Sequence, residues 1–469
     1  MPQTSFDDRP IAAPVGSSGP SFASPAAARP GPEPVPWFAN LVALLAGLGL
    51  GASGTLALSQ ESRATLSSLS GVLDATGRLS GVLGTYLMAV MLVLMARIPW
   101  LERTVGQDRL ARWHRRIGGW PIALIALHVV TVIEGYALVT RTTPWSQFVT
   151  FVLHYPDMLA AVVGFALLLV VGVVSYPPVR RRLRYETWWA AHLFVYLALA
   201  LAFAHQIKTG IVFLGHPLAV DLWVGGSALV LLTLLTSRLA MPIVVNVRHR
   251  LVLDRIEEVA PRVYALTVRG RRLDRLAVSG GQYFQWRFLA PGLLWHSHPY
   301  SLSALPRPPH MRVTVKALGD QTREIARLEP GTRVFVEGPY GAFTRHARTS
   351  RSVVLIGAGV GVTPLRAILD DLPADVAVTA ILRASTPEDL VHEDEISALV
   401  NARGGVVHHL VGRRHEVSLD ARTLRRLLPT IRTSDLYVCG PSGFTEGIRH
   451  AARQLRVPER RLHSEEFSF

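Results

Sequence analysis

The sequence predicts a multidomain protein: a six-helix transmembrane bundle, then an antiparallel β-barrel, then an α/β domain with a parallel sheet. Three observations predict it. Six apolar segments follow one another in the first half of the 469 residues. Short β-rich stretches separated by turn residues come next, and strands that alternate with helical stretches fill the rest. A chain of this length suggests more than one domain.

The apolar segments predict a membrane domain over residues 37–240. Each approximates the ~20 residues that cross the hydrocarbon core of a bilayer. The six segments are 37–58, 79–98, 117–139, 158–177, 186–206 and 219–240. Residues 1–36 hold nine prolines among Ala, Ser and Gly, and are predicted to form a disordered tail rather than a signal peptide.

The basic residues indicate how the spans are oriented. The net charge is +15, but the basic residues cluster beside apolar segments, which favours a lipid bilayer over nucleic acid as the partner. Loops after the second and fourth spans carry nine arginines, against four basic residues in the alternate loops. We therefore expect an integral plasma membrane protein with both termini and the C-terminal domains in the cytoplasm. A single cysteine excludes an intrachain disulfide.

Four histidines form two pairs in the third and fifth spans, which run parallel. His114 and His192 lie at the inner ends, and His128 and His205 lie roughly 20 Å further out. Each pair could ligate one haem through both axial positions, or each histidine could make a local hydrogen bond between helices. His192 and His205 are thirteen residues apart on the fifth span, which turns them about 140° away from each other on an ideal helix. Either that span is distorted or the haems differ in angle.

After Ala240 the pattern changes to a small antiparallel barrel over 246–346 and a parallel α/β domain over 350–469. In the second, "LIGAGVGVTPLRAIL" is a strand, a glycine turn and a helix start. Its glycines let the backbone approach a pyrophosphate at a helix N-terminus. The turn departs from the usual G-x-G-x-x-G spacing, so alone it does not identify a nucleotide-binding site.

Five motifs occur in the order of the ferredoxin-NADP reductase superfamily: "HPYS" (298–301), "GDQT" (319–322), "GPYG" (338–341), "GAGVGVTP" (357–364) and "CGP" (439–441). With the histidine spacing upstream, residues 37–469 resemble the NADPH oxidase and ferric reductase family, as a prokaryotic member without an EF-hand. The resemblance implies a ferric-reductase-type membrane domain with two b-type haems, an FAD-binding barrel and an NAD(P)H-binding domain.

The resemblance also implies roles for single residues, each of which could alone be an ordinary turn or strand residue. Residues implied to bind FAD are His298, Pro299, Tyr300, Ser301, Gly319, Thr322, Gly338 and Gly341. Residues implied to bind the nucleotide are Gly357, Gly359, Gly361, Thr363, Pro364, Gly440 and Pro441. Cys439 matches a cysteine near the nicotinamide, where we expect it to position the ring rather than to act as a nucleophile.

Two further expectations concern the cofactors' surroundings. Arg383 and Ser385 follow one strand of the nucleotide domain, and Arg413 and Arg414 follow the next. These side chains could clamp a 2′-phosphate, which predicts NADPH in preference to NADH. The alternative is a solvated basic surface. Phe467 is the aromatic residue near the C-terminus that is predicted to cover the flavin, with Phe469 as the alternative.

The sequence thus predicts an enzyme that passes electrons from NADPH through FAD, an inner haem (His114/His192) and an outer haem (His128/His205) to an extracytoplasmic acceptor. Dioxygen, giving superoxide, is the expected acceptor. Arg78 at the outer mouth of the second span is the residue expected to stabilise the anion, and the alternative is that it is an interface residue that snorkels toward water. The alternatives are a ferric chelate, a quinone, a periplasmic partner protein, or a non-enzymatic scaffold with a decayed reductase domain. The oligomeric state stays open.

Overall fold

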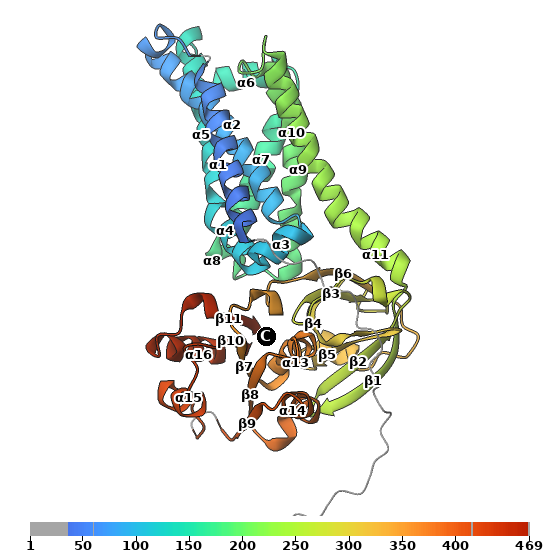
Figure 1. Cartoon of the computed structure of the whole chain (residues 1–469). Coiled ribbons are helices and arrows are strands. Elements are labelled where there is room, and N and C mark those ends of the chain that lie inside the picture. The colour runs from blue at the N-terminus through green and yellow to red at the C-terminus, as the bar shows by residue number, and fades with distance from the viewer. Residues whose placement is uncertain (1–35, 60, 414–415, 468–469) are drawn as a thin grey trace, which may run out of the picture.

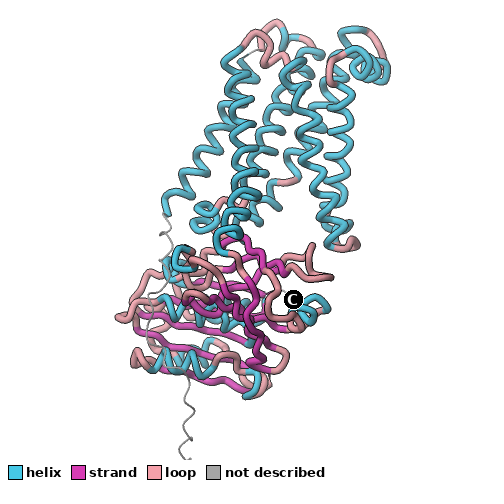
Figure 2. The backbone as a smooth tube through the Cα atoms, turned by 90° about the vertical axis from the view of Figure 1, so that its right-hand side faces the viewer, coloured by secondary structure: helices cyan, strands magenta, loops and turns pink. Residues whose placement is uncertain are grey.

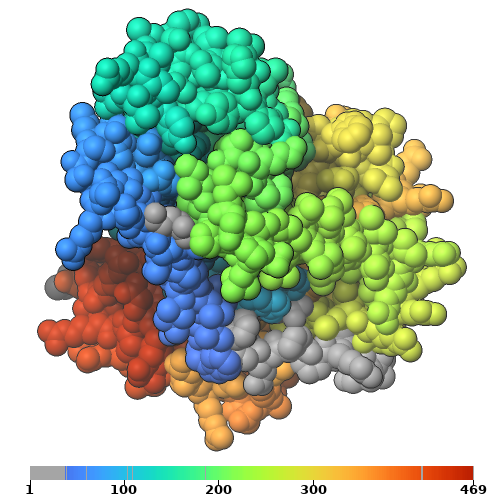
Figure 3. Space-filling model, turned by 90° about the horizontal axis from the view of Figure 1, so that it is seen from above, coloured from blue at the N-terminus to red at the C-terminus, as the bar shows by residue number. Residues whose placement is uncertain are grey.

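The computed structural model describes residues 36–59, 61–413 and 416–467. A bundle of membrane helices stands above two β-rich domains that lie next to each other (Figure 1). Figure 2 shows the same division, with helices above and strands below. Seen from above, the barrel and the nucleotide domain extend beyond the bundle on different sides (Figure 3). The fold class predicted from the sequence is confirmed, whereas the proline-rich tail lies outside the described residues.

Six helices of the described chain are long and apolar enough to cross a membrane. Their cores are α1 (Pro36–Ser59), α2 (Leu69–Leu94), α5 (Gly119–Thr140), α7 (Met158–Ser175), α9 (Tyr185–Thr209) and α10 (Pro217–Leu235). Shorter helices join them: α3 (Pro99–Val105), α4 (Gln107–Ile117), α6 (Pro144–His154), α8 (Pro177–Arg180) and α11 (Met241–His249). A π-helical turn, Thr236–Ala240, continues α10 into α11, so one long helix leans from the bundle down to the barrel (Figure 1).

The second span begins earlier than predicted. Helix α2 starts at Leu69, ten residues before the predicted start at residue 79. The hydroxyl of Ser68 caps this helix by accepting a hydrogen bond from the backbone N–H of Gly71 at 3.1 Å. Polar and small residues in the first turns, including Asp74, kept the hydropathy of this stretch low. Arg78 therefore lies within α2 and not before its first turn.

Small residues bring neighbouring membrane helices close together. A Cβ atom at Gly84 of α2 would lie 2.8 Å from a side-chain carbon of Ile125 in α5, and one at Gly164 of α7 would lie 2.7 Å from the carbonyl oxygen of Ala198 in α9. Such contacts allow dispersion attraction between helices where lipid offers no hydrophobic driving force. The histidine-bearing helices are thus held by close backbone packing.

The barrel is one six-stranded antiparallel sheet in the order β1-β2-β5-β4-β3-β6. Its strands are β1 (Val252–Ala260), β2 (Val263–Arg269), β3 (Tyr283–Phe288), β4 (His298–Arg307), β5 (His310–Lys316) and β6 (Val334–Tyr340), with the helix α12 (Asp320–Ile325) between the last two. A bridge between Val252 and Arg333 joins its two edges. Alternate side chains of β3, such as Phe284 and Trp286, are fully buried in the core.

Residues 246–249 were predicted to begin the barrel, but they form the last turn of α11. The side chain of Asn246 explains the difference, because its amide nitrogen donates to the carbonyl oxygen of Val336 at 2.7 Å and its oxygen accepts from the N–H of Val336 at 2.8 Å. These two bonds attach the end of the long helix to β6.

The last domain is a five-stranded parallel sheet in the order β11-β10-β7-β8-β9. Its strands are β7 (Ser352–Ala358), β8 (Ala377–Ala384), β9 (Val406–Val411), β10 (Asp435–Pro441) and β11 (Leu462–Phe467). Its helices are α13 (Val362–Asp371), α14 (Glu393–Asn401), α15 (Ala421–Leu427) and α16 (Ser442–Gln454). Two hydrophobic cores cover the two faces, one with α13 and α14 and the other with α15 and α16. The strand order reverses between β7 and β10, where such sheets bind ligands.

Candidate functional site

His114 and His192 face each other at the inner end of the bundle. Their ring centroids lie 6.1 Å apart and their planes cross at 68°. Metal–imidazole bonds of about 2 Å separate the centroids of two rings on one metal by about 6 Å, so this spacing suits two axial ligands. His114 comes from α4 and His192 from α9, two elements that are far apart in the sequence.

Hydrogen bonds orient two of the four imidazoles. The Nδ1 of His128 lies 2.8 Å from the carbonyl oxygen of Gly77, which can only accept, so Nδ1 carries the proton and Nε2 keeps its lone pair. A Cβ atom at Gly81 would lie 2.7 Å from the same nitrogen, so a glycine is required there. Ser175 binds the Nδ1 of His192 at 3.1 Å. Metal-ligating histidines are commonly oriented in this way through the nitrogen that does not bind the metal.

His128 and His205 line one cavity of about 470 Å³ in the outer half of the bundle. Most of its other lining side chains are apolar, such as Ile125, Phe151 and Leu168. The buried Nδ1 atoms of His114 and His205 have no hydrogen-bond partner among the described residues. One facing imidazole pair, and a second pair that lines an apolar cavity, are a donor set that fits two bis-histidine haems.

Arg78 also lines this cavity, but its guanidinium is already paired. Its Nε donates to one carboxylate oxygen of Glu61 at 2.7 Å and its Nη2 donates to the other at 2.8 Å. The side chain of Glu61 is 3% exposed. The sequence analysis missed this glutamate, and also Asp74, which lines the same cavity. The four-residue spacing of Asp74 and Arg78 on one helix was the available signal.

A second buried charge lies where the membrane domain meets the barrel. The side chain of Glu102 in α3 has both carboxylate oxygens buried without a hydrogen-bond partner in the described chain. Burial raises the pKa of this carboxyl to about 7, although Arg97 and Arg238 lower it. Arg97 lies over the ring of Tyr340 in β6, with its Cζ atom 5.1 Å from the centroid. This junction was not predicted from the sequence.

The "HPYS" stretch forms the start of β4. The rings of His298 and Tyr300 stack at 5.6 Å with an angle of 9° between their planes. Trp286 donates its indole N–H to the carbonyl oxygen of Tyr300 at 3.0 Å, which fixes the backbone there. Burial lowers the pKa of His298 to about 4, so its imidazole is neutral near pH 7. The phenol oxygen of Tyr300 and the Nε2 of His298 are buried without partners among the described residues, which fits a polar, flat cofactor such as flavin.

The other residues implied for FAD lie in two turns. The hydroxyl of Thr322 accepts a hydrogen bond from the backbone N–H of Gly319 at 2.9 Å. This bond caps the N-terminus of α12. Gly338 and Gly341 take left-handed φ values of +138° and +102° at the end of β6, where a side chain would be strained. Pro299 pairs with Gln285 across β3 and β4. The structure shows these positions and their backbone shape, and their contact with FAD stays a prediction.

The glycine turn lies at the carboxyl end of β7, beside the "CGP" stretch of β10. Gly359 has a left-handed φ of +54°. A Cβ atom at Gly361 would lie 2.5 Å from the carbonyl oxygen of Cys439, so only glycine lets the turn approach β10. Gly357 pairs with Cys439 in neighbouring parallel strands, and Thr363 and Pro364 are buried in the first turn of α13. The structure therefore brings the predicted nucleotide residues together.

Cys439 is fully buried, and burial raises the pKa of its thiol well above the usual value. A neutral, buried thiol is a poor nucleophile, which agrees with the positioning role expected from the sequence. Gly440 and Pro441 follow it, and Pro441 pairs with Phe467 at the ends of β10 and β11. Phe467 thus lies at the same edge of the sheet as the glycine turn.

The structure describes three of the four residues that were predicted to bind a 2′-phosphate. Arg383 donates to the carbonyl oxygens of Ala384 and Leu410, the latter at 3.3 Å, so its guanidinium joins β8 to β9. Ser385 and Arg413 are exposed. Residue 414 and Phe469 lie outside the described residues.

Three families match the chain in succession. Residues 80–203 match a ferric reductase like transmembrane component, residues 263–344 an FAD-binding domain, and residues 355–450 an oxidoreductase NAD-binding domain. The curated relatives include a flavohemoprotein of Deinococcus radiodurans, 30% identical over 215 residues, which are 41% of this chain and 52% of that protein. A flavohemoprotein of Bordetella pertussis is 34% identical over 213 residues, 40% of this chain and 52% of that protein. The chain spans about half the length of these relatives.

Solved structures align with about half of the chain. The FAD/NAD-binding domain of nitric oxide dioxygenase from Vibrio cholerae O1 biovar El Tor aligns with a TM-score of 0.39 and 22% identity, over 46% of this chain and 98% of that chain. The three matched domains follow one another in the order of the NADPH oxidase and ferric reductase family. The chain thus has the domain architecture of that family, and its FAD-binding and NAD-binding oxidoreductase domains support an enzyme.

Proposed function

We propose that the protein passes electrons from cytoplasmic NADPH, through FAD and two b-type haems, to dioxygen on the other side of the membrane, with superoxide as the product. The observation that carries this proposal is the facing of His114 and His192 at 6.1 Å, together with a second histidine pair in the outer cavity. Two pairs at two depths could each hold one haem. The arginine-rich segments 99–116 and 177–184, which connect membrane helices, support a cytoplasmic position for the soluble domains.

The residues that would hold the cofactors follow from the geometry above. The haem irons would bind His114 with His192 and His128 with His205, and the flavin would lie against the stacked rings at the start of β4. When bound, FAD converts a two-electron hydride donor into single electrons, and the haems carry those electrons. The chain itself supplies orientation: the carbonyl oxygen of Gly77 holds His128 with Nε2 free to bind a metal.

Dioxygen is the acceptor that the outer cavity supports best. If His128 and His205 both bound one haem iron, they would leave no room for an acceptor on it, and the acceptor would have to reach the cofactor through the cavity that they line. A small apolar molecule suits the predominantly apolar lining of this cavity. The guanidinium of Arg78 is paired with the carboxylate of Glu61. This negative charge offsets part of the attraction that the arginine would exert on superoxide as it forms.

A quinone is the second candidate, and Asp74 is the observation that favours it. The carboxyl of Asp74 lines the outer cavity and one of its oxygens is buried without a partner in the described chain. A reduced quinone takes up protons, and a carboxyl group can supply one.

The acceptor is tested by measuring NADPH-driven reduction of cytochrome c by the purified protein with and without superoxide dismutase. Release of superoxide predicts that the dismutase removes most of the activity. Activity that the dismutase leaves intact, together with faster turnover on a soluble quinone or on ferric citrate, would overturn the assignment of dioxygen.

A further inference from the structure

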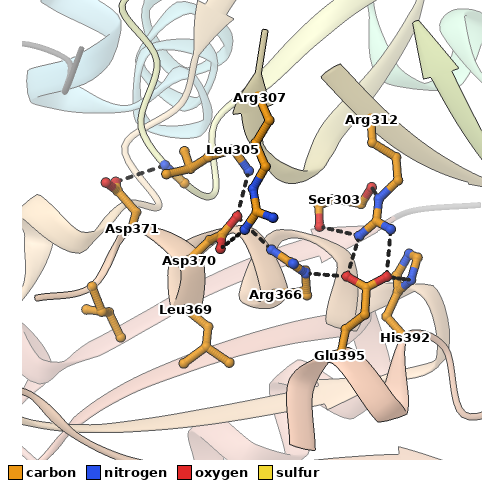
Figure 4. Close-up of polar contacts among 12 residues, drawn as sticks. Ser303, Leu305, Arg307, Arg312, Arg366, Leu369, Asp370, Asp371, His392 and Glu395 are labelled. Atoms are coloured by element: carbon orange, nitrogen blue, oxygen red, sulfur yellow. Dashed lines mark hydrogen bonds and ion pairs between the residues drawn. The ribbon is translucent and has the colours of Figure 1, made fainter. Parts of the chain in front are cut away.

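An ion-pair network joins the flavin barrel to the nucleotide domain, and the proposed electron path does not use it (Figure 4). The network takes residues from β4, β5, α13 and α14. Its charged members are Arg307, Arg312, Arg366, Asp370 and Glu395. The two domains that it joins are those expected to hold the donor and the acceptor of the first redox step.

Glu395 in α14 is fixed to the flavin-binding strand through Arg312. The Nη1 and Nη2 atoms of Arg312 donate to the two carboxylate oxygens of Glu395 at 2.6 and 2.8 Å. The Nε of the same arginine donates to the hydroxyl of Ser303 at 3.0 Å. Ser303 is fully buried in β4, two residues after Ser301. A bidentate pair of this kind fixes direction as well as distance.

Glu395 is fixed to the nucleotide-binding helix through Arg366. The Nε of Arg366 donates to one carboxylate oxygen of Glu395 at 2.7 Å, and its Nη1 lies 2.8 Å from an oxygen of Asp370. Asp370 in turn accepts from the backbone N–H of Leu305 in β4 at 3.2 Å. Arg366 lies one turn after Val362, where α13 begins beside the glycine turn.

The same carboxylate also reaches the segment that follows β8. His392, just before α14, contacts the hydroxyl of Thr314 in β5 at 2.9 Å and Glu395 at 3.4 Å. The loop that leads from β8 to His392 contains Ser385, a residue expected near the 2′-phosphate. Both segments expected to contact the nucleotide therefore meet at Glu395.

The charges of this network are partly withdrawn from solvent. The side chain of Arg366 is 7% exposed and that of Glu395 is 36% exposed. Burial alone would raise the pKa of Glu395, but the hydrogen bonds from His392 and Arg312 hold this pKa well below its usual range. A buried charge pair is costly compared with apolar packing, and what it adds is a defined geometry.

We infer that Glu395 is a positioning residue for the reduction of the flavin, because it sets the orientation of α13 and of the loop after β8 relative to β4. The inference rests on the proposed transfer of a hydride from the nicotinamide to FAD. Reacting atoms have to approach within about 3–3.5 Å in such a step, so a small rotation between the domains slows it without removing a binding contact.

The test compares Glu395→Gln with the wild type, as full-length protein that carries FAD and haem, without oxygen. Stopped-flow absorbance after mixing with NADPH gives the maximal rate of flavin bleaching, and titration with NADP⁺ gives the dissociation constant. We expect the bleaching rate to fall about tenfold while the dissociation constant stays near the wild-type value. Without nucleotide, hydrogen exchange in peptides from β4 and α13 should become faster. Glu459→Gln, which removes an exposed ion pair with Arg453, is the control and should match the wild type.

A bleaching rate in Glu395→Gln equal to that of the wild type would overturn the inference. If Glu395→Gln does not retain FAD, the bleaching rate is measured in Arg312→Lys instead. Lysine keeps the positive charge at this position but cannot form the bidentate pair with Glu395. A slower rate with bound FAD in Arg312→Lys supports the inference, and a wild-type rate contradicts it. If NADPH does not bleach the flavin of the wild-type protein, the result contradicts the proposed function and therefore also the inference that rests on it.

Discussion

At the residue scale, the imidazole pairs are the part of the site that the chain prepares most completely. The Nδ1 of His128 donates to Gly77, the Nδ1 of His192 contacts Ser175, and His114 lies beside His192. Orientation of this kind removes rotamer freedom before a metal binds. Each histidine therefore has a separate, testable consequence for haem content.

Replacing His205 with leucine should remove one of two haems and halve the haem content per FAD. The reason is that the outer iron would lose an axial ligand while the inner pair stays intact. Flavin bleaching by NADPH should persist, because it takes place in the soluble domains. The measurement is the reduced-minus-oxidised spectrum of the purified variant. His154→Leu, an exposed histidine of α6, is the control, and two remaining haems in His205→Leu would refute the assignment.

The pairing of Arg78 with Glu61 changes how Arg78 should be tested. Arg78→Ala leaves a carboxylate that is 3% exposed without its partner, which should destabilise the protein by on the order of 3 kcal/mol. The double variant Glu61→Gln/Arg78→Met should regain most of that stability. The readout is the melting temperature in detergent. If Arg78→Ala had the same melting temperature as the wild type, the ion pair would not contribute to the stability of the protein.

At the element scale, close approaches between backbones place the nucleotide turn. Gly361→Ala would bring a Cβ atom 2.5 Å from the carbonyl oxygen of Cys439 and so push the turn away from β10. We expect the dissociation constant for NADP⁺ to rise at least about tenfold, a loss of about 1.4 kcal/mol, with FAD content unchanged. Gly447→Ala in α16, where nothing lies within 4 Å, is the matched control. Unchanged nucleotide affinity in Gly361→Ala would show that the turn does not contact the nucleotide.

Elements were predictable from the sequence where one physical constraint dominates. The bilayer requires about 20 apolar residues per span, so six spans could be counted. The early start of α2 was missed because its first turns hold Asp74 and several small residues. Contacts between distant segments leave no local pattern, so neither the pairing of Glu61 with Arg78 nor the burial of Glu102 could be predicted. The approach of His114 to His192 could be predicted, since spacing along parallel helices sets the depth of each residue.

At the scale of the whole molecule, the two halves meet at the buried carboxyl of Glu102. Its pKa is raised from 4.5 to about 7 in the folded protein. Folding therefore favours the protonated form of this carboxyl. The stability that this protonation contributes is fully present below about pH 4.5 and is lost as the pH rises through about 7. The contribution amounts to about 3 kcal/mol at most.

Glu102→Gln mimics the protonated carboxyl and should remove this pH dependence. Above pH 7 the variant should melt at a higher temperature than the wild type, and the difference should shrink as the pH is lowered toward 5. Melting curves of the two proteins in the same detergent, taken between pH 5 and pH 8, provide the measurement. A constant difference across this range would mean that Glu102 does not titrate there.

The central claim is that electrons pass from a nicotinamide through the flavin to two haems in the membrane domain. The most direct measurement mixes the purified protein with NADPH in the absence of oxygen and follows the haem absorbance. The account predicts that both haems become reduced, to the same extent as with dithionite. A protein that binds FAD but shows no haem bands, or whose haems only dithionite reduces, would contradict it.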